Sequence, residues 1–460
     1  MGGCYNSRCK RGEILMAEYL TNTTDLTKVA SAIREKGGTS ASLVYPDGFV
    51  IAIQAIQTGP ELQIIVTVTS GATVTATKGS MSVSGTSVNG TCTLTVPEAG
   101  TWSVKATLNG QTSNTKNITF TDRYTTSLTF FSATITVTVE SGASVVLKKD
   151  GTTLQTKTST GTVVFTVTET GAYTVEATKS GQTVRETVNV VSSTTSYSLT
   201  LYFVSSTLNN NEWIVIKSVS DAGQGANYWS VGDRKAVTLN GTVGALTLSN
   251  FTTYAFIIGF NHNASLEGTN RIHFQLAKTA LSGGTDVALC DKHYINTSGG
   301  FRMNTSGSNS GGWASSNMRT AICGTSLSSY SGTIIAVIPA ALRVVLKSVT
   351  KYTNNTGYSS AASAVTATTD YFFLLSEYEV FGSTTYANRN EASKQAQYSY
   401  YSAGNSKVKY NHGATSTAVD WWLRSPFADS SGGFVFVYTD GTDTNTSSNY
   451  SLGFAPGFCV

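Results

Sequence analysis

The sequence predicts a multidomain, mostly β protein with a short helical segment at its N-terminus and a larger α+β domain at its C-terminus. Three observations lead to this fold class: the composition, an internal repeat and a change in residue usage near residue 213. The chain has 460 residues, enough for roughly three domains. Only 13% of them are charged, 43 are Gly and 6 are Pro, which excludes long charged helices, collagen and proline-rich fibres.

The net charge is +4, from 31 basic and 27 acidic residues spread along the chain. Such a balance creates no field that would recruit nucleic acid or anionic lipid, so we expect neither partner. No signal-peptide pattern opens the chain, and no apolar stretch reaches the length of about 18 residues that spans a bilayer. We therefore expect no membrane insertion.

Two short helices are expected near the N-terminus, the first capped by Thr24 or Asp25 and the second following the turn at residues 45–48. Both have apolar residues at helical spacing. These are Leu26, Val29, Ala30 and Ile33 in the first helix, and Phe49, Ala52, Ile53 and Ile56 in the second. We expect residues 1–15 to be an extension and residues 16–59 to form a helical segment. Residues 26–38 and 45–49 resemble a segment that recurs near the N-termini of phage tail and prophage structural proteins of Gram-positive hosts, which implies an attachment role.

The next region contains two copies of one unit, offset by 71 residues without a gap. Residues 66–72 match 137–143, residues 110–112 match 181–183, and Trp102 maps onto Tyr173. Each copy consists of short Val- and Thr-rich segments of period 2 separated by Gly turns, the pattern of an antiparallel sandwich. We expect two immunoglobulin-like modules, at residues 60–126 and 127–196, that act as spacers. A linker strand at residues 197–212 follows.

The repeat indicates a structural role for Cys92. It alternates with Leu94 and Val96, and its counterpart in the second copy is Val163. We therefore interpret Cys92 as a small buried hydrophobic residue rather than as a reactive thiol. The six cysteines show no spacing typical of a disulfide framework or a zinc site, so no metal and no cofactor are expected.

Residues 213–460 form the last predicted domain. Five of the six tryptophans and all four histidines lie there. We expect a buried strand at residues 254–260, helices around residues 334–349 and long Gly/Ser/Asn loops such as residues 304–312. The histidines (His262, His273, His293 and His412) belong to no catalytic motif. Glu377 and Glu379 are expected on one face of a strand, paired with Arg319 or Arg424. No catalytic residue is predicted, and we expect no enzyme activity.

The run Trp421-Trp422-Leu423-Arg424-Ser425-Pro426, with residues 372–382 before it and 453–460 after it, resembles a recurrent C-terminal domain of gut-bacterial and phage proteins. Residues 228–233, 258–263 and 317–319 extend the resemblance to the whole of residues 213–460. That domain looks like a C-type-lectin or formylglycine-generating-enzyme fold. The calcium-binding triplets of lectins and the close cysteine pair of the oxidases are both missing from this sequence, which argues against both activities.

The tail also resembles the variable proteins of diversity-generating retroelements, in which adenine-directed mutagenesis rewrites codons near the end of the gene. Segments rich in Ser, Thr, Asn and Gly lie between the motifs at residues 421–426 and 453–460. Almost all of their residues can be reached from Asn, Ser or Thr codons by changing adenines. An alternating strand at residues 434–438 separates them and ends at a hairpin-like turn. The predicted contact surface is two loops and an exposed strand face: Phe427, Ala428, Asp429, Ser430, Ser431, Gly432, Gly433, Phe436, Tyr438, Thr442, Asp443, Thr444, Asn445, Thr446, Ser447, Ser448, Asn449 and Tyr450. The predicted frame is Trp421, Trp422, Arg424, Glu377 and Pro456.

Together these resemblances imply a phage or prophage tail-tip or fibre adhesin, located in the virion. Its partners would be a host cell-surface receptor, protein or glycan, and other tail proteins, with a homotrimer as a further expectation. The alternative is a carbohydrate-binding adhesin of the bacterial surface. A third interpretation, an enzyme of the formylglycine-generating type, would require a thiol-dependent activity at Cys290, Cys323 or Cys459.

Overall fold

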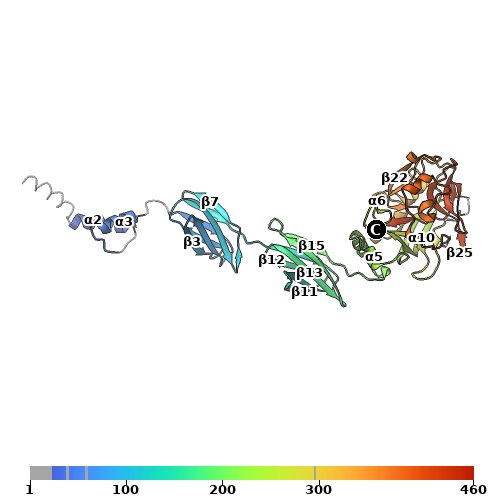
Figure 1. The fold of residues 1–460 in the computed structure, drawn as a ribbon. Helices are drawn as coiled ribbons and strands as arrows, with labels where there is room; N and C mark the ends of the chain where they lie inside the picture. The colour runs from blue at the N-terminus through green and yellow to red at the C-terminus, as the bar shows by residue number, and fades with distance from the viewer. Residues whose placement is uncertain (1–22, 38–40, 57–60, 295–296) are drawn as a thin grey trace, which may run out of the picture. The chain divides into compact units, whose positions relative to one another are not determined.

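The structure is a computed structural model that describes residues 23–37, 41–56, 61–294 and 297–460. The predicted extension at residues 1–15 and the first residues of the helical segment lie outside the described residues. The predicted fold class is confirmed in its coarser form, because the chain is multidomain and mostly β (Figure 1). It divides into two compact units, the second of which contains residues 200–460 and the hairpin tip at residues 177–184.

The two predicted N-terminal helices are present, as α2 (Thr23–Gly37) and α3 (Asp47–Gln54). They share a small core of Ala30, Ile33 and Phe49. Val29 and Ile53 were predicted on the apolar faces, but they are 47% and 52% exposed. Among the described residues, the cluster that the two helices share leaves Val29 and Ile53 largely uncovered.

The first module is a sandwich of two sheets, with strand orders β4-β1-β8 and β3-β2-β5-β6, where β7 also pairs with β5. The antiparallel prediction holds for most of the pairs, but β1 and β8 run parallel. Its strands are β1 (Gln63–Thr67), β2 (Thr73–Lys78), β3 (Met81–Thr86), β4 (Thr91–Thr95), β5 (Gly100–Leu108), β6 (Gln111–Thr112), β7 (Lys116–Phe120) and β8 (Arg123–Ser127).

The second module repeats this arrangement, with strand orders β12-β9-β15 and β11-β10-β13-β14. Its strands are β9 (Ala133–Thr138), β10 (Ser144–Lys149), β11 (Thr152–Thr158), β12 (Thr162–Val167), β13 (Gly171–Lys179), β14 (Gln182–Val190) and β15 (Ser196–Thr200). The predicted boundary after residue 196 is wrong. β15 pairs with β9, so the first residues of the predicted linker strand complete the second sandwich.

The two module cores confirm the repeat at the level of single side chains. Trp102 and Tyr173 are both buried, and each donates its polar hydrogen to the carbonyl four residues earlier, at Glu98 and Glu169. Cys92 is 3% exposed, as its interpretation as a buried hydrophobic residue predicted. The period-2 pattern thus buries one face of each strand in the core of its own module, and this burial fixes which face of each strand points inward.

The C-terminal domain is built on a five-stranded sheet of order β16-β17-β18-β30-β23. The last strand of the chain is inserted between β18 and β23, and residues 451–460 are all buried. Phe458 stacks on Phe274, and both rings contact Trp213 edge-on. The apolar C-terminus therefore forms the centre of this domain. The strands are β16 (Arg234–Val243), β17 (Leu246–Phe260), β18 (Ile272–Lys278), β23 (Phe372–Phe373) and β30 (Gly457–Cys459).

Smaller sheets and short helices complete the domain. The strands are β19 (Val287–Ala288), β20 (Thr297–Ser298), β21 (Val349–Asn354), β22 (Val365–Asp370), β24 (Lys409–Asn411), β25 (Ala414–Val419), β26 (Trp421–Pro426), β27 (Gly433–Val437), β28 (Asp443–Ser447) and β29 (Tyr450–Ser451). The helices are η1 (Leu208–Asn210), α4 (Trp213–Asp221), α5 (Gly225–Tyr228), α6 (Ala264–Glu267), η2 (Met318–Cys323), α7 (Ile334–Val337), α8 (Ala340–Arg343), η3 (Ala362–Ala364), α9 (Glu377–Phe381), η4 (Arg389–Ser393) and α10 (Ser399–Ser402).

The predicted buried strand at residues 254–260 is confirmed as the end of β17. The predicted helices around residues 334–349 are single turns, α7 and α8, because Pro339 lies between them and cannot continue a helix. Within the described residues, no helix combines the length and the apolarity needed to cross a membrane.

Candidate functional site

The predicted contact region is organised by the sheet β26-β27-β28. β27 pairs with β28 in an antiparallel hairpin, closed by the hydrogen bond from the Tyr438 N–H to the Thr442 carbonyl. Gly441 in this turn has φ +91°, a backbone conformation that other residues rarely adopt, so the predicted hairpin turn is confirmed. Two loops, at residues 427–432 and 448–449, flank the hairpin.

The predicted frame residues all lie in the interior. Trp421, Trp422, Arg424 and Glu377 have no exposed surface, and Pro456 is buried as well. The indole N–H of Trp421 donates to the Lys407 carbonyl at 2.9 Å, and that of Trp422 donates to the Phe301 carbonyl at the same distance. Both tryptophans therefore combine apolar packing with a satisfied polar atom, which fixes their orientation.

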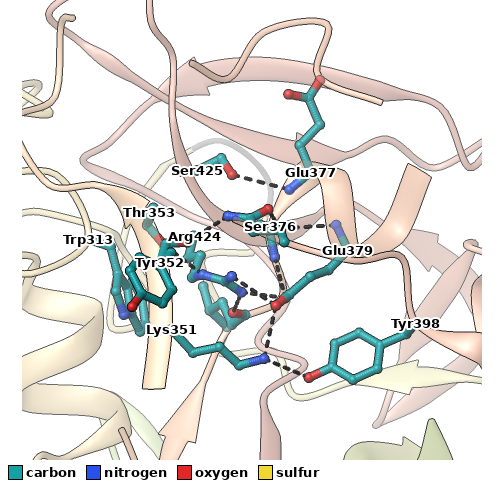
Figure 2. A network of polar contacts seen from close by, with 12 residues as sticks. Trp313, Lys351, Tyr352, Thr353, Ser376, Glu377, Glu379, Tyr398, Arg424 and Ser425 are labelled. Carbon is teal, nitrogen blue, oxygen red and sulfur yellow. Dashed lines mark hydrogen bonds and ion pairs between the residues drawn. The ribbon is translucent and has the colours of Figure 1, made fainter. Parts of the chain in front are cut away.

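A polar network surrounds the side chain of Arg424, a residue of β26 (Figure 2). Its guanidinium binds both carboxylate oxygens of Glu379, donates to the Thr353 hydroxyl at 2.7 Å and donates to the Leu374 carbonyl at 2.9 Å. Burial alone would raise the pKa of Glu379, but Arg424 and Lys351 hold it well below its usual range. The predicted pairing of Glu379 with Arg424 is therefore confirmed.

Lys351 extends the network to a second carboxylate. Its ammonium lies 2.9 Å from Glu379, 2.7 Å from Glu267 and 2.8 Å from the Tyr398 hydroxyl, and its side chain is fully buried. Burial raises the pKa of Glu267 to about 7, although the Lys351 charge acts in the opposite direction. Two basic and two acidic side chains thus balance their charges in the interior, where an unpaired charge would be costly.

His262, Glu267 and Glu379 place three potential metal ligands within 4.8 Å of one another. The Lys351 ammonium already contacts both carboxylates and occupies the cation position between them. Burial lowers the pKa of His262 to about 3, so its ring is neutral and stacks on Tyr398. These contacts fit a structural ion network better than a metal centre.

Glu377 and Glu379 differ from the prediction in their secondary structure. They lie in helix α9, whose first turn is closed by a capping box between Ser376 and Glu379. Among the residues that the structure describes, no arginine pairs with Glu377. Its carboxyl accepts hydrogen bonds from the consecutive backbone N–H groups of residues 385–387 and lies near the carboxyl of Asp443 on β28. Burial, reinforced by Asp443, raises the pKa of Glu377 to about 8. Arg319 pairs instead with Asp370.

The predicted contact residues divide by exposure. Exposed are Asp429, Ser431, Tyr438 and Thr442; half-buried are Phe427, Ser430, Gly432, Asp443, Thr444, Asn445, Thr446, Ser447, Asn449 and Tyr450. Four were wrongly predicted to offer contacts, because they are buried: Ala428, Gly433, Phe436 and Ser448. β27 is the central strand of its sheet and is covered on both faces, so the predicted exposed strand face does not exist there. The half-buried edge strand β28 takes its place.

A third segment, residues 304–310, lies beside the two predicted loops. The fully buried Asn309 donates its side-chain amide to the carbonyls of Phe427, Ser430 and Gly433, at 2.8–3.1 Å. The Ser448 hydroxyl is shared between the carbonyls of residues 306 and 308. The sequence marks this segment as a Ser/Asn/Gly-rich loop, but nothing in the sequence pairs it with the chain end.

A fourth segment, residues 354–359, packs against the third. The Gly311 N–H donates to the Thr356 carbonyl, and a Cβ added to Gly357 would lie 2.2 Å from the Asn309 carbonyl oxygen. Tyr358 in this segment is 63% exposed. We call the four segments at residues 304–310, 354–359, 427–432 and 442–449 the loop surface.

The cysteines proposed for the enzyme alternative are buried. Cys290, Cys323 and Cys459 are at most 3% exposed. Burial raises the pKa values of Cys290 and Cys459 to about 12, so both are neutral thiols. Cys459 contacts the His273 ring at 3.3 Å, but His273 is itself fully buried and its pKa is lowered by burial. A thiol needs access and thiolate character to react, and these three have neither.

Residues 285–460 match a family model described as "Domain of unknown function (DUF6273)". No curated protein matches the chain. Among solved structures, it is similar to GBS52, the minor pilin of Streptococcus agalactiae, with 10% identity and a TM-score of 0.21, covering 31% of this chain and 96% of that one. It is also similar to the major pilin of Streptococcus pyogenes, with 13% identity and a TM-score of 0.14, covering 32% of this chain and 97% of that one. At these TM-scores the likenesses carry no weight for fold or function.

Proposed function

We propose that this chain is a tail-tip or fibre adhesin of a phage or prophage that binds a receptor on the bacterial surface through the loop surface. The observation that carries the proposal is the joining of four Ser/Thr/Asn/Gly-rich segments over a frame of fully buried side chains. Loops held by a rigid scaffold are where proteins place recognition residues. Tyr, Ser, Gly and Asn also dominate antibody binding sites, because they combine rigid contact area with adaptable hydrogen bonding.

In this proposal the N-terminal helices attach the chain to other tail proteins, and the two sandwich modules are spacers. The chain acts by binding, without a catalytic step. Several copies on one virion, as in a homotrimer, would multiply a weak single-site affinity. Adenine-directed mutagenesis of the last codons would vary the loop surface between virions.

Binding of the labelled full chain to a panel of Gram-positive cells tests the adhesin function. The variant Ser431→Trp inserts a bulky side chain into the loop surface, and Ser329→Trp, at an exposed position outside it, is the matched control. We expect saturable binding to some strains, its loss in Ser431→Trp and its retention in Ser329→Trp. Absence of binding to every strain, or equal binding by both variants, would contradict the proposal.

Two further observations test the phage assignment. Antibody labelling of particles and of cell envelopes from an induced culture separates a virion protein from a bacterial surface adhesin. Sequencing the DNA downstream of the gene should reveal a reverse-transcriptase frame and a near-copy of codons 421–460 that differs mainly at adenines. Absence of both would remove the diversification part of the proposal and leave the adhesin part standing.

A further inference from the structure

The pair of helices α2 and α3 has a core that is too small to make it stable by itself. Within the described residues, this core consists of Ala30, Ile33 and Phe49, and no residue of either sandwich module belongs to it. Residues 23–56 contain no Cys or His that could form a disulfide or bind a metal. Units of fewer than about 40 residues that lack such links usually need oligomerisation. We therefore expect a further surface to pack on these helices.

Helix α3 has exposed apolar side chains in addition to its buried ones. Phe49 is buried in the core shared with α2, whereas Val50, Ile51 and Ile53 are 51%, 66% and 52% exposed. The helix contains one charged residue, Asp47, in its first turn. A helix that is hydrophobic on all sides is normally buried. The exposed apolar side chains of α3 therefore indicate an interface.

Helix α2 carries a row of side chains with opposite charges at its two ends. Asp25, Val29, Ala32 and Lys36 are spaced four, three and four residues apart, which places them on one side of the helix. All four are exposed, and we call them the α2 stripe. Asp25 contacts Lys28 at 3.4 Å, but both side chains are more than half exposed, so this ion pair contributes little and Asp25 can form another.

The order of the four residues makes the α2 stripe complementary to itself in an antiparallel pair. Asp25 of one copy lies opposite Lys36 of the other when Val29 lies opposite Ala32, because both pairs have their midpoint between residues 30 and 31. A parallel pair would place Asp25 beside Asp25 and Lys36 beside Lys36, and like charges repel. A two-fold interface uses the same patch on both subunits, and the α2 stripe meets this requirement.

We infer that two copies of this chain associate through helices α2 and α3, with their α2 stripes paired antiparallel. The second copy is favoured over a different protein because the α2 stripe supplies both charges of each ion pair itself. This inference goes beyond the proposed function, since it concerns no receptor. The paired helices would then be the unit that attaches to other tail proteins, and each assembly would carry two C-terminal domains, which increases its avidity.

The mass of the full chain in solution tests the inference. Light scattering after size-exclusion chromatography, at low salt and over a range of concentrations, should give a mass of two chains that falls to one on dilution. Val29→Asp places a charge at the centre of the interface and should abolish the dimer. Ser31→Asp, at an exposed position on the other side of α2, is the matched control and should remain dimeric.

Reversing the charges separates pairing from loss of the helix. Asp25→Lys and Lys36→Asp should each weaken the dimer about tenfold, the equivalent of about 1.4 kcal/mol, because each places like charges opposite one another. The double variant Asp25→Lys/Lys36→Asp should dimerise again, and a mixture of the two single variants should form a heterodimer. The double variant has the less favourable charge at both ends of α2, so its recovery cannot come from a more stable helix.

The possible outcomes decide between a second copy and other arrangements. A mass of one chain at all concentrations overturns the inference and assigns the apolar surface to a different partner. A mass of three chains overturns the antiparallel pair and favours a homotrimer. A dimer that persists in Val29→Asp, or that the single charge reversals leave unchanged, forms through another surface and also overturns the inference.

Discussion

Replacing Arg424 by Met tests whether the buried ion network holds the frame of the C-terminal domain. The substitution keeps most of the side-chain volume but removes the donors to Glu379, Thr353 and Leu374. Glu379 would remain fully buried and would still pair with Lys351. Removing one partner of a buried pair typically costs about 3–5 kcal/mol, because it leaves an uncompensated charge. In a domain of this size the melting temperature would then fall by about 6–20 °C.

Tryptophan fluorescence during guanidinium unfolding is the appropriate assay, because five of the six tryptophans lie in residues 213–460. Lys217→Met is the matched control, since its pair with Asp221 is 31% and 46% exposed and should contribute less than about 1 kcal/mol. The low pKa of Glu379 adds a pH signature: its contribution is present above the usual value of 4.5 and is lost as the pH falls below it. The reasoning would be refuted if Arg424→Met lost no more stability than the control, or if its stability changed with pH below 4.5 in the same way as that of the unsubstituted protein.

Four further outcomes are expected. The pKa of Glu377 is raised to about 8, so the folded state holds a proton that the unfolded state releases near pH 4.5. The free energy of unfolding should therefore fall as the pH rises from about 4.5 to about 8, and it should fall less in Glu377→Gln. Denaturant titrations at several pH values would measure this difference. Asn309→Ala should lower the free energy of unfolding by about 1–3 kcal/mol, because three backbone carbonyls lose their hydrogen-bond donor, and it should weaken cell binding. Unchanged stability in chemical unfolding would show that these hydrogen bonds do not hold the loop at residues 427–433. Phe458→Ala should cost about 3–5 kcal/mol in the same assay, because it opens a cavity in the central sheet. Cys92→Val should change the stability of the first module by less than about 1.5 kcal/mol, and a larger loss by calorimetry would show that the thiol makes a specific contact.

The two sandwich modules were predictable because the sequence patterns that determine their strands are local and occur twice. Period-2 patterns identified the strands, and the offset of 71 residues reproduces β2 in β10 and β5 in β13 without a shift. The strand bounds differ most at the last strand, where β8 and β15 begin 73 residues apart. The predicted boundary after residue 196 falls inside β15 (Ser196–Thr200), because a sequence repeat does not show where the last strand of each module ends.

The errors in the C-terminal domain have different physical causes. Ser376 and Glu379 form the S-x-x-E pattern of a capping box, a sequence signal that predicts the helix start actually found at α9. The burial of Phe436 had no such signal, because an alternating strand looks the same whether it is an edge or a centre until its neighbours are known. The segment at residues 304–310 joins the loop surface through contacts across more than 100 residues, which no local pattern encodes.

The hydrogen bonds that hold the loop at residues 427–433 explain how its side chains could vary without unfolding the domain. Asn309 binds the carbonyls of residues 427, 430 and 433, its own N–H binds the carbonyl of residue 431, and the Ser448 N–H binds that of residue 432. Every residue type presents a carbonyl, so these bonds do not depend on the loop's side chains. Gly433 is an exception, because a Cβ there would lie 3.0 Å from the Thr446 carbonyl oxygen. Diversity that follows this pattern would be extensive at Asp429 and Ser431 and absent at Gly433, and a set of natural variants of this gene would reveal the difference.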